Sequence, residues 1–263
     1  MLGREQVLTI TFFIVLFLVL YMGCDTKSPT QKLEEKSRAQ NFELISMDRL
    51  EKEAIADLPI SPKTALMDMR QVMQRADSDS IKVKTLKSMA SLWYANGQPL
   101  ISGHYAEKVA EIEQTPEAWN IAGTTYSIAM QQSAPESNEK EHAVNKSRQV
   151  LENALSMSPE NINTKINLAL TYVEAPLEDN PMKGILMLVG LNKEHPENTS
   201  VLFQLGRLSI QTGQFDKAVA RLTKVVELRP TFLEAHCLLA EAYKGQGQTQ
   251  LAKKELDICN KNI

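Results

Sequence analysis

Two stretches of this sequence repeat one another at a fixed distance of 34 residues. Five positions of the first stretch return in the second, as Leu205 and Leu239, Gly206 and Ala240, Gly213 and Gly247, Ala218 and Ala252, and Leu222 and Leu256. Two prolines, Pro196 and Pro230, have the same spacing. A period of this length is typical of units built from two helices, which bury their apolar faces only by stacking on one another. The repeat therefore predicts an all-α array and leaves little room for a strand-containing fold.

The quoted positions resemble the tetratricopeptide repeat. That pattern has a large residue, Leu-Gly, an aromatic, a turn glycine, a second aromatic, an alanine, a large apolar residue, a second alanine and a closing proline. It is filled here by Leu202, Leu205, Gly206, Gly213, Phe215, Ala218, Leu222, Val225 and Pro230. Ser209 departs from the pattern at the tyrosine position, and Val225 departs at the second alanine. The resemblance implies a right-handed solenoid, in which helical hairpins of this kind follow one another along the chain.

Simple packing rules explain the residue types in this pattern. Helix axes approach to about 8–10 Å, and small residues such as Gly206 and Ala218 allow the near end of that range. Gly213 can adopt the left-handed backbone conformation that ends a first helix. Pro230 cannot continue a second helix, so the chain turns there into the next unit.

The same pattern extends toward the N-terminus with longer connections. Trp119, Ala122, Gly123 and Tyr126 match a first helix, and Leu151, Ala154 and Pro159 match a second. We expect a tetratricopeptide-like solenoid over 81–263, with units at about 81–115 (degenerate), 116–161, 162–198, 199–232 and 233–263. Two insertions, QQSAPESNEKEHAVNK and APLEDNP, read as solvated loops. In the last helix we expect Leu251, Leu256 and Cys259 to face inward, beneath a polar outer face that caps the array.

The N-terminal part contains an apolar segment over residues 7–23, VLTITFFIVLFLVLYMG, which carries no charge. Its length is at the short limit for a membrane-spanning helix. Residues 1–24 are therefore expected to be a transmembrane anchor, with a lipoprotein signal that ends at Cys24 as the alternative and a cleaved signal as the third possibility. The favoured location is a single pass in the cell membrane, with the solenoid in a bacterial periplasm.

Between this segment and the repeats, the sequence predicts a linker and one helix. Residues 25–61 are rich in charged and polar side chains, which is typical of a solvated linker. Residues 62–80 predict an amphipathic helix, because Pro62 suits a first turn and Leu66, Met69 and Met73 recur at helical spacing. That methionine-containing stripe is expected to pack into a core.

Composition and motifs favour binding over chemistry. The net charge of −3 and the mixed charges argue against a nucleic-acid partner. The four histidines show no metal-ligand spacing, and no nucleophile or phosphate-loop motif is present, so no enzyme activity, metal, cofactor or small-molecule substrate is predicted. Cys237 and Cys259 are expected to be small, half-buried apolar residues, with a disulfide between them as the alternative.

The resemblance implies a partner-binding groove lined by the first helices of the units. Carried over position by position, it comprises Asn120, Thr124, Asn163, Ile166, Asn167, Phe203, Gln204, Arg207 and Glu241. Its amides could hydrogen-bond an extended peptide, and Ile166 and Phe203 would offer apolar pockets. The predicted function is a membrane-tethered scaffold or adaptor for a protein or peptide partner, chaperone-like or acting in assembly at the cell envelope. The alternative is a structural lipoprotein subunit of a stable membrane complex.

Overall fold

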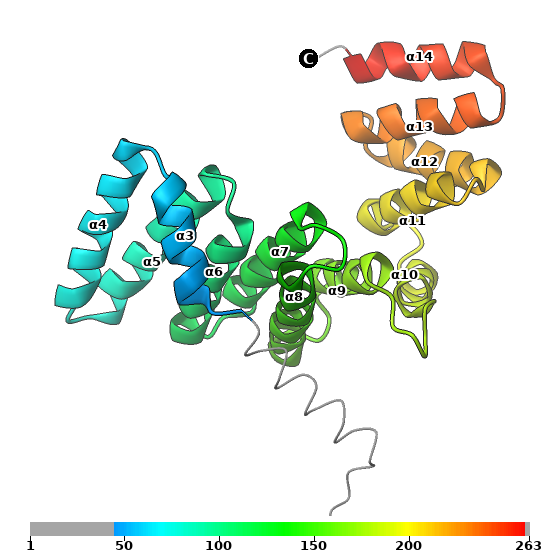
Figure 1. Ribbon diagram of the computed structural model, residues 1–263. Coiled ribbons are helices and arrows are strands. Elements are labelled where there is room, and N and C mark those ends of the chain that lie inside the picture. The colour runs from blue at the N-terminus through cyan, green and yellow to red at the C-terminus, as the bar shows by residue number, and fades with distance from the viewer. Residues whose placement is uncertain (1–44, 261–263) are drawn as a thin grey trace, which may run out of the picture. The chain divides into compact units, whose positions relative to one another are not determined.

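The computed structural model describes residues 45–260 of the 263-residue chain, and this part contains twelve α-helices and no strand (Figure 1). The helices are α3 (Met47–Asp57), α4 (Ile60–Arg75), α5 (Asp79–Ala95), α6 (Pro99–Glu113), α7 (Pro116–Gln132), α8 (Asn138–Met157), α9 (Ile162–Glu174), α10 (Lys183–Glu194), α11 (Thr199–Gln211), α12 (Phe215–Leu228), α13 (Leu233–Gly245) and α14 (Thr249–Cys259). The all-α prediction is confirmed. Residues 7–23 and Cys24 lie outside the described residues. Within residues 45–260, no helix combines the length and the apolar character that a bilayer crossing requires.

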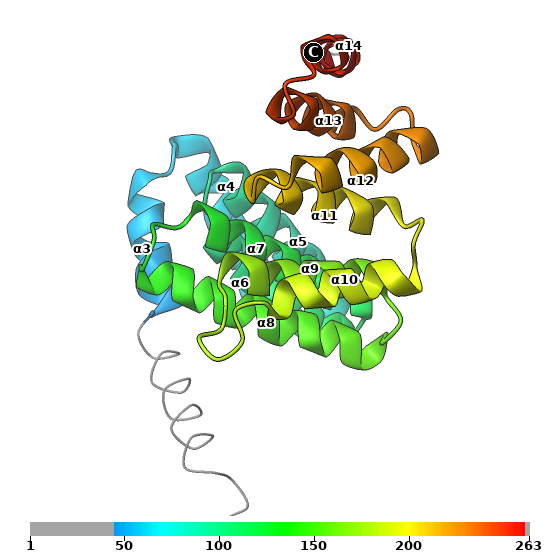
Figure 2. The ribbon, with the colours of Figure 1, turned by 90° about the vertical axis from the view of Figure 1, so that its right-hand side faces the viewer.

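Ten of these helices form five hairpins, α5–α6, α7–α8, α9–α10, α11–α12 and α13–α14. Each hairpin packs on the next, through α6 with α7, α8 with α9, α10 with α11, and α12 with α13 (Figure 2). The buried side chains form clusters at these helix contacts, such as the one joining Ala218 and Leu222 to Leu239 and Ala242. The core is therefore distributed along the row of hairpins.

Glycines in the left-handed conformation make the turns of three hairpins. Gly97, Gly213 and Gly247 have φ angles of 72°, 69° and 74°. In the α11–α12 turn, the Gly213 amide donates to the Ile210 carbonyl and the Gln214 amide donates to the Ser209 carbonyl, at 2.9 and 2.8 Å. These bonds satisfy carbonyls that the end of α11 leaves without helical partners. The role predicted for Gly213 is confirmed.

Other glycines lie where two helices come closest. A Cβ atom on Gly206 would lie 2.7 Å from Cγ of Leu222, and one on Gly123 would collide with the Leu151 side chain. Leu222 and Leu151 are fully buried in the second helices of their hairpins. The expected pairing of Gly206 with Ala218 needs correction, because the nearest side chain to Gly206 is Leu222, one helical turn further along α12. Ala218 is buried in the neighbouring cluster with Leu239 and Ala242.

An arginine compensates for the missing tyrosine at Ser209. The Ser209 hydroxyl donates to the Leu205 carbonyl at 2.7 Å. The guanidinium of Arg221, from α12, donates to the same carbonyl at 3.2 Å and to the Ser209 hydroxyl. The small residue in α11 thus leaves room for a long side chain that ties the two helices of the hairpin together.

The N-terminal helices differ from the expected linker. Helix α3 lies inside the predicted 25–61 linker, and the Ser46 side chain caps it by accepting from the Arg49 amide. It packs on α6, where the Tyr105 hydroxyl donates to Glu51 Oε1 at 2.6 Å. Burial of Ala54 and partial burial of Met47 and Leu50 explain why a segment of linker-like composition is helical.

The helix expected over 62–80 begins earlier and ends earlier than predicted. Helix α4 covers Ile60–Arg75, with Pro62 in its first turn, and Ser78 already caps the next helix. Leu66 is buried, and Met69 and Met73 are half-buried against the same cluster. The methionine stripe therefore serves core packing, as expected.

The first insertion is mostly helix and not loop. Helix α7 runs to Gln132 and α8 begins at Asn138, so only 133–137 form the turn. Its charged composition suggested a loop, but Ala143, Val144, Ser147 and Val150 are buried on one face of α8. His142 therefore belongs to a helix. The second insertion, APLEDNP, does lie between α9 and α10 without helical structure.

Cys237 and Cys259 form a disulfide, so the expectation of two small apolar residues was wrong and the alternative was right. By the 34-residue period they correspond to Phe203 and Val225, which pack with Phe232 and Ala235 of the following hairpin. No described helix follows α14 to supply such contacts, and the covalent bond links α13 to α14 instead. Closing a loop of this size constrains the unfolded chain by about 3 kcal/mol.

The expected inward orientation of Leu251 and Leu256 was also wrong. Their exposed fractions are 43% and 47%, whereas Leu222, which corresponds to Leu256, is completely buried. The difference has a simple cause, because α13 packs on α12 and no described helix packs in the same way on α14. Only Cys259 of α14 is buried.

The glycine contact can be tested with a matched pair of substitutions. We expect Gly206→Ala to lower the free energy of unfolding by about 1–3 kcal/mol, because its methyl group would overlap Leu222. Gly190→Ala is the control, since Gly190 lies in α10 with nothing within 4 Å of its Cβ position. It should raise stability by about 0.5–1 kcal/mol through helix propensity. Urea denaturation followed by circular dichroism measures both, and equal effects of the two variants would contradict the packing described.

Candidate functional site

The predicted groove residues of α7 and α9 come together, but they bond to one another. The Asn167 side-chain amide donates to Asn120 Oδ1 at 3.3 Å and to Thr124 Oγ1 at 3.2 Å. The Thr164 hydroxyl donates to the same Asn120 oxygen at 3.1 Å. This network joins the first helices of two consecutive hairpins. Because Asn120 Oδ1, Thr124 Oγ1 and the Asn167 amide nitrogen are already partnered, Asn120, Thr124 and Asn167 have reduced capacity for a ligand.

A second polar group continues along α9 and α11. The Arg207 guanidinium donates to Gln204 Oε1 at 3.0 Å and lies 3.9 Å from Glu174 Oε1. Asn163 and Glu241 are exposed on α9 and α13. These residues form a polar surface on the first helices.

Neither apolar residue of the predicted groove offers an open pocket. The side chain of Ile166 is only 4% exposed and packs with Leu188, Val201 and Leu205. Phe203 is half-buried and stacks on Phe232, with ring centroids 4.8 Å apart. Both side chains hold one hairpin against the next, so the expectation of two open apolar pockets was wrong.

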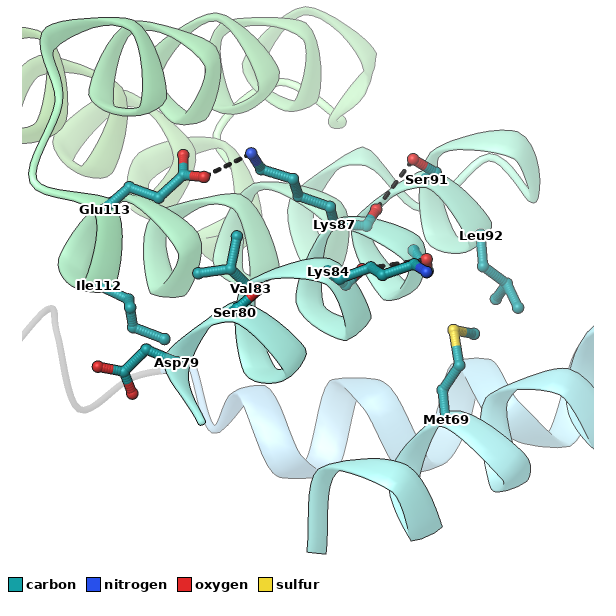
Figure 3. Close-up of a pocket in the computed structure, with 11 residues that line it drawn as sticks. Met69, Asp79, Ser80, Val83, Lys84, Lys87, Ser91, Leu92, Ile112 and Glu113 are labelled. Atoms are coloured by element: carbon teal, nitrogen blue, oxygen red, sulfur yellow. Dashed lines mark hydrogen bonds and ion pairs between the residues drawn. The ribbon is translucent and has the colours of Figure 1, made fainter. Parts of the chain in front are cut away.

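The structure has a large open groove elsewhere, at the N-terminal end of the hairpins. It has a volume of about 1050 Å³ and lies along α5, between α4 and the last turn of α6 (Figure 3). Its apolar side chains are Met69, Val83, Leu92 and Ile112, and its polar ones are Asp79, Ser80, Lys84, Lys87, Ser88, Ser91 and Glu113. We call it the α4–α5 groove.

Helix α5 has two faces of different character, and this difference creates the groove. Leu86, Met89 and Trp93 are buried against the N-terminal cluster. The other face carries Ser80, Lys84 and Ser91 at helical spacing, and all three are exposed. Helix α4 covers only part of this face, because Leu66 is its only buried residue. A strip of α5 therefore stays open beside Met69.

Hydrogen bonds and one ion pair fix the polar rim. The Lys87 ammonium donates to Glu113 Oε1 at 2.6 Å, which joins α5 to the end of α6. The Ser91 hydroxyl donates to the Lys87 carbonyl at 2.9 Å, and that of Ser88 donates to the Lys84 carbonyl at 3.1 Å. Because both hydroxyls donate to carbonyls of their own helix, the two serines present only small side chains to a ligand.

A smaller cavity continues the α4–α5 groove toward the next hairpin. It measures about 260 Å³ and shares Lys87, Ser91 and Glu113 with the larger one. Its other lining residues are Ala90, Ala106, Val109, Ala118 and Ile121. Ile121 in α7 is 58% exposed, which is high for such an apolar side chain. Together the two cavities form a mostly apolar path from α4 to α7.

This arrangement is suited to binding a segment of another molecule. Apolar side chains at the floor gain free energy when a ligand covers them, and polar groups at the rim set the ligand's orientation. No set of three His, Cys, Asp or Glu side chains within residues 45–260 is placed to hold a metal ion.

Sequence reasoning missed this groove because the first unit is degenerate. The repeat pattern transfers binding positions only where a unit matches it, and residues 81–115 match weakly. One signal was present in the sequence. Ser80, Lys84, Lys87, Ser88 and Ser91 follow helical spacing on the face opposite Leu86, Met89 and Trp93, and no apolar partner helix was predicted to cover them.

A buried polar cluster holds the hairpin beside the groove. The Tyr126 hydroxyl and the Lys146 ammonium both donate to the Glu107 carboxylate, each at 2.7 Å. Burial, with Glu107 close by, raises the pKa of Tyr126 well above its ordinary range. Burial and the nearby Lys108 lower the pKa of His104 to about 4. The cluster ties α6 to α7 and α8.

One family model, described as TPR repeat, matches residues 201–247. Residues 201–247 therefore contain a tetratricopeptide repeat. The recognition made from the 34-residue period is thus confirmed, and the matched residues cover most of α11 and all of α12 and α13. No curated protein matches the sequence.

Several solved structures resemble this one at low identity. A crystal structure of the protein MamA is 16% identical, covering 68% of this chain and 90% of its own, with a TM-score of 0.44. MamA from Desulfovibrio magneticus RS-1 is 15% identical, covering 70% and 95%, with a TM-score of 0.45. YrrB, described as a TPR protein with an unusual peptide-binding site, is 18% identical, covering 73% and 90%, with a TM-score of 0.39.

The half-buried side chain of His104 predicts a dependence of stability on pH. Because folding lowers the pKa of His104 from 6.5 to about 4, the unfolded chain binds more protons between these values. The free energy of unfolding should therefore fall as the pH decreases from 7 toward 4, by about 2 kcal/mol from this group at pH 5. His104→Gln should remove that part of the loss, whereas His195→Gln, in a turn between hairpins, should leave it. Urea titrations at pH 7 and pH 5 measure the difference, and an unchanged loss in His104→Gln would contradict the assignment.

Proposed function

We propose that this tetratricopeptide protein is a membrane-tethered scaffold that holds a protein partner by a peptide segment in the α4–α5 groove. The observation that carries the proposal is the open, mostly apolar groove itself, lined by four apolar side chains from three helices. Its volume is similar to that of cavities that bind small ligands and peptide anchors. The role is chaperone-like or in assembly at the cell envelope, and it requires no catalysis.

The α4–α5 groove lies at the protein surface, where a segment of a partner protein can reach it. Serine side chains line much of the exposed strip of α5, so a bound backbone can approach closely. Helix α4 packs mainly on α5 and offers Met69, a flexible side chain that adapts to different apolar ligands. Ile121 extends the apolar path onto α7, where a longer segment would gain further contact.

The polar surface of α7, α9, α11 and α13 provides a second contact region in this proposal. Asn163 and Glu241 are exposed, and Arg207 and Gln204 are half-buried and hydrogen-bonded to one another. Asn120, Thr124 and Asn167 would contribute mainly by holding neighbouring hairpins in register. We assign the anchoring contacts to the α4–α5 groove and the weaker, orienting contacts to this surface.

The proposed tether is the apolar segment 7–23, with the helical part outside the cytoplasm. The Cys237–Cys259 disulfide supports this placement, because disulfides persist in oxidising compartments and are rare where thiols are kept reduced. A periplasmic location satisfies both features.

Filling the groove should remove the partner. Ser91 is exposed and lines both cavities, so Ser91→Trp should fill them without disturbing the core. In affinity purification from native membranes, we expect Ser91→Trp to recover at least about tenfold less bound partner than the parent protein does. Ser156→Trp, at an exposed position of α8, is the matched control and should bind as the parent protein does. Equal recovery of the same partners by both variants would refute docking in this groove.

The compartment can be tested through the thiols. Cells expressing the full chain are quenched with acid, treated with a thiol-alkylating reagent and analysed peptide by peptide in a mass spectrometer. We expect Cys237 and Cys259 to be alkylated only after reduction, because the disulfide forms on the oxidising side of the membrane. Alkylation of both cysteines at the moment of quenching would contradict the proposed placement.

A further inference from the structure

The disulfide of the last described hairpin points to a property that is separate from the α4–α5 groove. We infer that the Cys237–Cys259 bond is a redox-sensitive latch for α14, so that its reduction by a dithiol releases this helix while the other hairpins stay folded. Release uncovers the side of α13 on which α14 lies. Four features support this, namely the small burial of α14, the place of the disulfide, the scarcity of other ties and the access to sulfur.

Helix α14 buries few of its side chains, although it packs along α13. In α12, Leu222 and Val225 are completely buried, because α13 covers the outer side of that helix. One 34-residue period later, Leu256 is 47% exposed and only Cys259 is buried. Apolar burial is the main favourable contribution to such contacts, so packing holds α14 less firmly than it holds α12.

The disulfide closes the end of the hairpin that the turn leaves open. The turn contains Gly247 and joins the end of α13 to the start of α14. Cys237 lies near the start of α13, and Cys259 is the last residue of α14. The bond therefore fixes the end of α14 that is about 15 Å from the turn, at 1.5 Å per residue. Without the bond, the backbone joins the two helices only at the turn.

One polar contact accompanies the disulfide. His236 Nδ1 lies 2.6 Å from Glu255 Oε2, and His236 Nε2 lies 3.0 Å from the Pro230 carbonyl oxygen. Within residues 45–260, no other ion pair reaches α14. A single hydrogen-bonded pair stabilises a structure less than closure of a loop with a sequence separation of 22. After reduction, α14 therefore opens more often although this contact remains.

A dithiol can reach the bond through Cys237, which is half-buried, whereas Cys259 is 7% exposed. A thiolate of the dithiol attacks the Cys237 sulfur, a mixed disulfide forms, and Cys259 leaves as a thiolate that takes a proton from water. The second thiolate of the reductant then attacks its own sulfur in the mixed disulfide and releases Cys237, which is protonated in the same way. Two electrons pass to the protein, which gains two thiols, and the dithiol becomes a disulfide.

Hydrogen–deuterium exchange followed by mass spectrometry tests the latch on the full chain in detergent micelles. The parent protein is measured in the oxidised state and after reduction with dithiothreitol, a dithiol. The double variant Cys237→Ser/Cys259→Ser is the control, measured with and without the same reagent. This variant cannot form the bond, so any effect of dithiothreitol on it arises elsewhere, for example at Cys24.

We expect reduction to speed the exchange of α14 amides by about tenfold to hundredfold, which is the scale of the loop-closure contribution. Amides of α7 and α8 should keep their rates, because these helices bury their side chains in a cluster of their own. The double variant should exchange like the reduced parent with and without dithiothreitol. Reoxidation of the parent should restore slow exchange in α14.

Three results would overturn the inference. Equal exchange of α14 in the oxidised and reduced parent would mean that packing alone holds the helix. A uniform rise across all hairpins would mean that the disulfide stabilises the whole row. A bond that dithiothreitol leaves intact in the folded protein, at a concentration that reduces it in urea, would be out of reach of a dithiol. None of these results affects docking in the α4–α5 groove, which the Ser91→Trp variant tests separately.

Discussion

The close approach of the two helices within a hairpin is the contact on which the rest of this structure depends. At Gly206 and Gly123 the absence of a side chain allows a leucine of the second helix to reach the first. That leucine is buried completely and also contributes to the contact with the neighbouring hairpin. Each hairpin thus completes the burial of its apolar residues by packing on its neighbours, as in other repeat proteins, whose units contact only the units next to them.

Within residues 45–260, the first and last hairpins differ in the contacts that their outer sides make. In the last described hairpin, the Cys237–Cys259 disulfide occupies the positions that correspond to Phe203 and Val225. In the preceding hairpin, Phe203 and Val225 pack against the hairpin that follows. At the N-terminal end, α3 packs on α6 and α4 covers α5 only partly. The candidate site follows directly from that incomplete cover, because the exposed strip of α5 becomes the floor of a groove. The proposed docking site therefore lies where the repeat pattern is weakest.

The fold could be predicted from the sequence because its determinants are local and periodic. Gly97, Gly213 and Gly247 adopt the left-handed conformation at three of the hairpin turns, and the 34-residue spacing of leucines and small residues specifies two helices in each unit. The groove could not be predicted in this way, since it depends on how far α4 covers α5. The predicted binding residues were misjudged for a related reason. Spacing places Ile166 and Asn120 on first helices, but only the three-dimensional contacts reveal that one is buried and the other is bonded to a neighbouring helix.

The most direct measurement of the central claim is an NMR experiment on methyl-labelled protein. Nuclear Overhauser effects report protons that lie within a few ångströms of one another. The structure predicts strong effects between the α protons of Gly206 and the methyl groups of Leu222, and equally between Gly123 and Leu151. Absence of both, with the methyl groups of Leu222 showing contacts only to its own helix, would contradict the packing of these hairpins and everything argued from it.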